Sequence, residues 1–280
     1  MTTRAMNIVQ TDFAAMSMAE RVRHFEVEGY VLLPALIDKH QVARLSAELA
    51  DLPMNAADYS AAQTSAATPP QWHSRAVAEL IGHPPMIAFL RELMGDDIVF
   101  TRAHFARSHP GHPGISLHTD GQPYGSSIFD WEGSSPVMVR ALYYLHDLTP
   151  ERSPFRIVPR SHISFHADAN PYLRYESHPG EVTICAKAGD GLVFAVRAFH
   201  GTHPNVSDGP REMVQYGYRP GWAGPVQPIP EWDPELVASA PQSARPFLQS
   251  RNKADWKWEL ENKPKDMKTY ARGIDPQRWA

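Results

Sequence analysis

Two segments that lie far apart in the sequence carry side chains capable of binding a metal ion. The first, at residues 117–120, contains His118 and Asp120, and the second, at residues 200–211, begins with His200. Two imidazoles and one carboxylate on one side of a metal leave positions open on the other, as in non-haem Fe(II) oxygenases. Alternate residues of a strand project to the same side, so His118 and Asp120 can share one ion that His200 reaches from a distant strand.

Context favours a metal site over a chance pattern. The chain has 14 histidines, so a His-x-Asp triplet alone could equally be an exposed turn. However, His118 follows a loop rich in proline and glycine, at 109–114, so it is expected to start a strand near the mouth of a barrel. His200 follows the apolar run 192–199 and is expected to end a strand. Histidine and aspartate do not by themselves select iron. A zinc- or manganese-dependent hydrolase or isomerase, and a non-catalytic binding module, remain alternatives.

Arg211 closes the second segment, at the start of the next expected strand. A guanidinium group can hold a carboxylate through two parallel hydrogen bonds. A co-substrate with a 2-oxo acid at one end and a carboxylate at the other would therefore bridge the metal and Arg211.

Three further residues are candidates for the substrate pocket. Arg102 and His104 lie two apart on the strand that precedes His118, so they face the same side. Tyr143 and Tyr144 face opposite ways on another strand, so at most one of them can line a pocket, and Tyr143 is the candidate.

The composition is that of an ordinary globular protein, with 42% hydrophobic and 21% charged residues. The net charge of −4 gives no basic surface that would indicate a nucleic-acid partner. One cysteine, Cys185, excludes an internal disulfide framework and a cysteine-rich metal site, which favours the cytoplasm. No apolar run approaches a membrane-spanning length, so no membrane partner is expected. Nothing in the sequence indicates the oligomeric state.

Helical periodicity comes first along the chain and strand periodicity later. We expect helices at 18–28, after Asp38 and from Pro84, and a loop at 54–71. Strands are expected at 29–34, 98–100, 137–145, 182–186, 192–196 and 213–219. This order favours an antiparallel sandwich or barrel with a helical layer on one side. One domain over 1–280 is expected, with its core at about 20–220 and a Trp- and Pro-rich extension, 221–280, packed on that core.

The chain resembles the phytanoyl-CoA dioxygenase (PhyH) family of Fe(II)/2-oxoglutarate oxygenases. Five segments follow one another in the order of that family, at residues 28–34, 117–120, 155–162, 189–190 and 200–211. Two positions depart from the pattern, because the family usually has glycine where this chain has Ser153 and Arg160. Both lie outside the metal-binding segments, so they bear on turns rather than on chemistry.

The resemblance implies a mainly β fold with flanking helices around a double-stranded β-helix, or jelly-roll, core. It implies that His118, Asp120 and His200 bind Fe(II), and that Arg211 holds the distal carboxylate of 2-oxoglutarate with help from the hydroxyl of Thr202. The implied reaction consumes O2, releases succinate and CO2, and hydroxylates a small organic molecule. Asp120 argues against a halogenase, because halogenases of this type lack the carboxylate. The substrate is left open, since the loops expected to line the pocket (54–73, 121–136, 163–180 and the tail) vary most.

Overall fold

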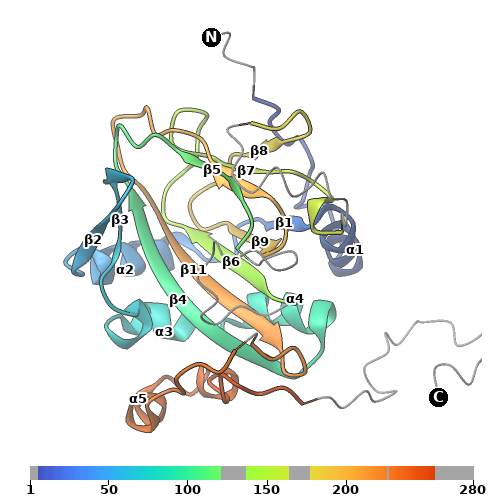
Figure 1. Ribbon diagram of the computed structural model, residues 1–280, viewed down its shortest axis with the longest axis vertical. Coiled ribbons are helices and arrows are strands. Elements are labelled where there is room, and N and C mark those ends of the chain that lie inside the picture. The colour runs from blue at the N-terminus through green and yellow to red at the C-terminus, as the bar shows by residue number, and fades with distance from the viewer. Residues whose placement is uncertain (1–5, 121–136, 164–176, 226, 256–280) are drawn as a thin grey trace, which may run out of the picture.

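Two antiparallel β-sheets form the centre of the protein (Figure 1). The computed structural model describes residues 6–120, 137–163, 177–225 and 227–255 of the chain. The larger sheet has the strand order β1 (Tyr30–Leu33), β9 (Gly191–Ala195), β6 (Val139–Tyr144), β11 (Arg211–Pro220), β4 (Ile98–Ser108), β3 (Ser60–Ala66) and β2 (Met54–Ala57). The smaller sheet has the order β5 (Ile115–His118), β10 (His200–Thr202), β7 (Phe155–Ile157) and β8 (Val182–Ile184).

The two sheets face each other across a packed aromatic interior. Phe194 of β9 lies 5.1 Å, between ring centroids, from Phe155 of β7 and 4.3 Å from His200 of β10. These contacts join the larger sheet to the smaller one, and all three side chains are buried. The interior between the sheets is therefore where the long strands and the His200 segment meet.

The outer face of the larger sheet is covered by helices. The strand β11 anchors one of them through its tyrosines: Tyr216 donates a hydrogen bond to the backbone oxygen of Val77 (2.9 Å), and Tyr218 donates one to that of Ile81, the C-cap of the same helix (3.0 Å). Val77 belongs to α3 (Arg75–Leu80), which precedes α4 (Pro84–Met94). A sheet buried on both faces needs apolar residues on both sides of its strands, and every residue of β6 is buried.

The three helices expected from the sequence are confirmed. Helix α1 covers Met18–Glu28, α2 covers Lys39–Leu49, and α4 opens on two prolines and ends at Gly95. Asp38 caps α2 as expected, because its side chain accepts a hydrogen bond from the backbone N–H of Gln41 (2.7 Å).

The expectation of a loop at 54–71 is wrong. Residues 54–57 and 60–66 form the hairpin β2–β3, which extends the larger sheet beyond β4. The hairpin consists mainly of small Ala, Ser and Thr residues on an exposed edge, so the alternation of apolar and polar residues that reveals a strand is missing. Helix α3 was not expected either, because six residues give too few turns for a helical period.

The segment after β11 lies along β4 and the helical layer. Trp232 stacks on Phe100 at 5.6 Å between ring centroids, and the guanidinium carbon of Arg251 lies 4.5 Å from the Trp232 ring. Helix α5 (Pro234–Ser239) follows, and Phe247 is buried. Trp256, Trp258 and Trp279 lie outside the described residues. Among the residues described, no helix combines the length and the apolar character needed to span a lipid bilayer.

Gly189 permits a close approach that a side chain would prevent. It has φ +89°, and a Cβ atom there would clash with the backbone oxygen of Ile37. Gly111 has a similar φ of +85° but open space around the position of a Cβ.

We therefore predict that Gly111→Ala lowers the free energy of unfolding by about 1 kcal/mol, the cost of a left-handed alanine. Gly189→Ala should lower it by a further 1–3 kcal/mol or so, because the backbone must also move. Urea unfolding followed by tryptophan fluorescence measures both. Equal losses in the two variants would contradict the role given to the Ile37 contact.

Candidate metal centre

The ends of β5 and β10 bring three potential metal ligands together. His200 is paired with His118 across the two strands, and Asp120 follows two residues after His118. Oδ1 of Asp120 lies 3.5 Å from Nε2 of His118 and 3.6 Å from Nε2 of His200. The three ligand atoms lie within 4.8 Å of one another. One ion at about 2.1 Å from each atom fits this spacing.

Both imidazoles are held in the tautomer that a metal requires. Nδ1 of His118 lies 2.8 Å from the backbone oxygen of Ser116, and Nδ1 of His200 lies 3.0 Å from that of Ala198. A carbonyl oxygen can only accept, so each Nδ1 carries the hydrogen. Each Nε2 then presents its lone pair towards Asp120, which is how backbone acceptors orient metal-binding histidines.

Arg140 of β6 fixes the carboxylate of Asp120. Its Nε donates a hydrogen bond to Oδ2 of Asp120 at 2.9 Å, which leaves Oδ1 directed at the two histidines. Arg140 is itself buried, at 6% exposed. One oxygen of the carboxylate is therefore committed to the arginine, and the other is available for a metal.

The electrostatics of the site keep His200 neutral and Asp120 ionised. Burial, and then the charge of His118, lower the pKa of His200 to about 4, so His200 is neutral at pH 7. Burial acts to raise the pKa of Asp120, but the charges around it hold that pKa well below its usual value. Since His200 is neutral, we attribute this effect mainly to Arg140. The result is an anionic oxygen beside the neutral imidazole of His200.

Arg140 was missed by the sequence analysis, although the sequence holds a signal for it. It is the one charged residue in the run 137–145, which is otherwise apolar or aromatic. A lone arginine in the centre of a strand that is buried on both faces needs a partner, and here the partner is Asp120.

Arg211 lies at the start of β11, buried at 2% exposed. Its Nε has no hydrogen-bond partner among the described residues, and its guanidinium carbon lies 5.3 Å from the centroid of the Tyr144 ring. Thr202, at the end of β10, is also buried, and its hydroxyl oxygen accepts a hydrogen bond from the backbone N–H of Ile115 (3.2 Å). Arg211 thus offers a buried donor to an acceptor from outside the chain.

Strand register divides the remaining pocket candidates between the two faces of the larger sheet. Gly217 of β11 is paired with Arg102 of β4 and with Arg140 of β6. Paired residues project to the same face, so Arg102, and His104 two residues on, lie on the face of Arg140, towards the metal centre.

The expectation that Tyr143 lines the pocket is wrong. Tyr143 projects to the outer face, where its hydroxyl lies 3.4 Å from Nδ1 of His83 and its ring packs 5.4 Å from that of Tyr216. Tyr144, the next residue, takes the inner face beside Arg211. The alternation of the strand was expected correctly, but the sequence did not show which face of β6 is covered by helices.

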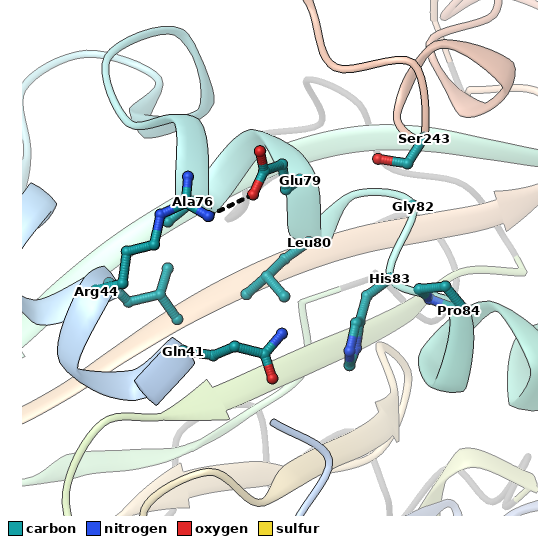
Figure 2. A pocket seen from close by; sticks show the side chains of 10 residues that line it. Gln41, Arg44, Ala76, Glu79, Leu80, Gly82, His83, Pro84 and Ser243 are labelled. Carbon is teal, nitrogen blue, oxygen red and sulfur yellow. Dashed lines mark hydrogen bonds and ion pairs between the residues drawn. The ribbon is translucent and has the colours of Figure 1, made fainter. Parts of the chain in front are cut away.

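A cavity of about 280 Å³ lies among the helices, and Figure 2 shows the side chains around it. Arg44 and Glu79 form an ion pair of 2.6 Å at its edge, and His83 lies on its lining. The cavity shares no residue with the three metal-ligand candidates and is a separate feature of the helical layer.

Sequence comparison places the chain in a family. The model of the phytanoyl-CoA dioxygenase (PhyH) family matches residues 25–213, which is more than half of the chain. The protein belongs to the PhyH family. No curated protein matches the sequence.

Solved structures with a similar fold support this placement. The epimerase SnoN from nogalamycin biosynthesis, described as non-haem and α-ketoglutarate-dependent, is 21% identical over 79% of this chain and 86% of its own, with a TM-score of 0.62. The carbocyclase SnoK from the same biosynthesis is 19% identical over 81% and 97%, with a TM-score of 0.65. HygX from Streptomyces hygroscopicus, solved with nickel, 2-oxoglutarate and hygromycin B, is 19% identical over 72% and 86%, with a TM-score of 0.62. The expected mainly β, double-stranded β-helix fold is confirmed.

The two departures from the PhyH pattern coincide with unusual backbone conformations. Ser153 has φ +44° and Arg160 has φ +67°, both in the left-handed region that favours glycine. Each side chain makes a contact that glycine lacks: the hydroxyl of Ser153 donates to the backbone oxygen of His203 (2.7 Å), and Arg160 forms an ion pair with Glu28 (2.8 Å). The turns therefore persist without glycine, and side-chain contacts offset part of their strain.

The Asp120–Arg140 pair leads to a prediction about metal affinity. Arg140→Gln removes the charge that holds Asp120, and changes of this kind typically weaken metal binding by about 10- to 100-fold. Anaerobic Fe(II) titration measures the affinity. Arg107→Gln is the matched control, because Arg107 of β4 forms a similar ion pair with Glu212 (2.6 Å) away from the three ligand candidates. Equal metal affinities in the two variants would remove Arg140 from this role.

Proposed function

We propose that the protein is an Fe(II)/2-oxoglutarate-dependent dioxygenase that hydroxylates a small organic molecule and releases succinate and CO2. The observation that carries the proposal is the convergence of His118, Asp120 and His200, with both Nε2 atoms and one carboxylate oxygen directed at a common point. Two nitrogens and one oxygen on one side of a metal are the donor set of non-haem Fe(II) oxygenases. Membership of the PhyH family, and the 2-oxoglutarate-dependent enzymes among its structural neighbours, point the same way.

The residues present also fit 2-oxoglutarate. A buried guanidinium with an unpartnered Nε costs free energy unless an acceptor reaches it. The distal carboxylate of 2-oxoglutarate supplies such an acceptor, and Arg211 is the residue that would hold it. Thr202 would add its hydroxyl group. The hydroxyl oxygen accepts a hydrogen bond from Ile115, so its own hydrogen is still available for donation.

The chain's own residues position the reactants and exclude water. Iron with 2-oxoglutarate and O2 supplies the oxidising power when bound, as cofactors generally carry the hard chemical step. His118 and His200 provide ring nitrogens whose orientation is set by backbone carbonyls. Arg140 keeps Asp120 ionised and limits it to one metal-facing oxygen. Phe155 and Phe194 pack against the His200 ring and close that side of the centre to solvent.

The same fold is used for more than one outcome, since SnoN is an epimerase and SnoK a carbocyclase. For this chain we propose hydroxylation, with a small molecule that binds beside the metal as substrate. The retained carboxylate of Asp120 leaves no vacancy for a halide ion among the protein ligands.

The proposal predicts that the purified protein converts 2-oxoglutarate to succinate only when both Fe(II) and O2 are present. Asp120→Ala should reduce succinate formation by at least about 100-fold, because it removes one of three ligands and leaves Arg140 without its partner. Succinate is measured by chromatography. A zinc- or manganese-loaded protein serves as the control. Turnover of another substrate by that protein, without succinate formation, would favour the hydrolase or isomerase alternative.

The role given to Arg211 is tested with a pair of 2-oxo acids. The wild-type protein should bind 2-oxoglutarate at least about 100-fold more tightly than pyruvate, which lacks the distal carboxylate. Arg211→Gln should abolish most of that preference and leave the weak pyruvate affinity unchanged. Calorimetry on the metal-loaded protein gives the four affinities. An unchanged affinity of Arg211→Gln for 2-oxoglutarate would exclude Arg211 from this role, and Arg107→Gln controls for the loss of a partly buried arginine on the same sheet.

A further inference from the structure

Two arginines flank a glycine on the inner face of the larger sheet. Gly217 of β11 is paired with Arg102 on one side and with Arg140 on the other. A Cβ atom on Gly217 would clash with Oγ1 of Thr101, and it would lie 2.7 Å from Nη1 of Arg140 and 3.6 Å from Cγ of Arg102. The two arginine side chains and the Thr101 hydroxyl therefore meet over the bare backbone of Gly217. We call these three residues the arginine row.

Arg140 has hydrogen-bonding capacity that the protein does not use. Its Nε serves Asp120, whereas its Nη1 is buried and has no hydrogen-bond partner within the part of the chain that the structure describes. A buried charged donor without an acceptor is costly, so such a group indicates a missing partner. Nη1 is also the atom that lies closest to the position of a Gly217 Cβ among the arginine-row atoms, so the unused donor is directed into the row.

The arginine row lies at the opposite end of β11 from Arg211. Gly217 lies six positions after Arg211, which is about 20 Å of extended strand. A 2-oxoglutarate molecule that bridges the metal and Arg211 would extend from the metal away from the row, which leaves the row for a different ligand. The row also adjoins the metal centre directly, because Arg140 contacts Asp120.

A cavity lies along β4, and Arg102 is the arginine-row residue that lines it. It has a volume of about 360 Å³, and its lining includes Arg102, His104, Arg251, Gln71 and Trp232. This size is within the range of small-molecule sites. Among the described residues that line it, none is acidic. Burial, and then the charges of Arg102 and Arg140, lower the pKa of His104 to about 4, against the opposing effect of Asp120.

We propose that the arginine row is a specificity subsite for an anionic group of the substrate, a carboxylate or a phosphate. The inference rests on the proposed function, because it assigns the substrate to the part of the interior that 2-oxoglutarate would leave unoccupied. Nη1 of Arg140 donates to the anion from the metal side, and Arg102 donates from the cavity side. The remainder of the substrate occupies the cavity beside His104 and Trp232.

The test uses three probes of similar shape: phenylacetate, phenyl phosphate and neutral phenylacetamide. They are titrated into the full chain loaded with 2-oxoglutarate and zinc(II), a diamagnetic stand-in for iron, and binding is followed by ligand-observed NMR. Saturating 2-oxoglutarate fills the Arg211 end, so a probe anion cannot report on that arginine. We expect at least one of the acids to bind about tenfold or more tightly than the amide. The tighter acid identifies the preferred anion.

Arg102→Gln should remove that preference, and Arg91→Gln should retain it. Arg91 of α4 is a surface arginine, at 55% exposed, whose side chain pairs with Asp96 outside the interior. Circular dichroism confirms that each variant is folded. The inference is overturned if neither acid binds, if acid and amide bind equally, or if Arg102→Gln keeps the preference. Affinity for 2-oxoglutarate is measured in the same samples: its absence counts against the proposed function, whereas its presence without an acid preference counts against the arginine row alone.

Discussion

The pairing of His118 with His200 across β5 and β10 is the constraint on which the metal centre depends. These two strands are short, and the residues that they join are far apart in the sequence. Backbone carbonyls set both imidazole tautomers, and Arg140 of the facing sheet orients Asp120. The centre is thus assembled from both sheets, so any change in how the sheets pack would move the ligands relative to one another.

Burial explains why the centre needs Arg140. Burial alone would raise the pKa of a carboxylate beside two imidazoles, and the carboxylate would tend to be protonated. The guanidinium of Arg140 reverses that tendency, and its own burial is made tolerable by the same ion pair. The pair therefore serves to keep an anion available for a cation, at the cost of leaving Nη1 of Arg140 without an acceptor. Arg140 therefore connects the metal centre, through its Nε, to the arginine row, through its Nη1.

Local signals in the sequence were enough to predict the helices and to select the three ligand candidates. They failed for residues whose role depends on an element packed against their strand. Asp38 and Pro84 marked helix starts correctly, because capping and proline geometry are local effects. Tyr143 was assigned to the wrong face, since alternation fixes which residues share a face but not which face the helices cover. Arg140 was missed because its partner, Asp120, comes from a distant segment next to the other sheet.

The two ends of the long strand β11 present different residues to the interior. One end carries Arg211, whose unpartnered Nε suits a distal carboxylate, and the other carries Gly217 between Arg102 and Arg140. The outer face of the same strand is fixed to helix backbones by Tyr216 and Tyr218. A strand held in this way keeps its two ends at a set separation. In the arrangement that we propose, two anionic ligands bind on the same side of this one strand without competing. The inward residues of the strand would then select the ligands, while its outward residues hold the fold.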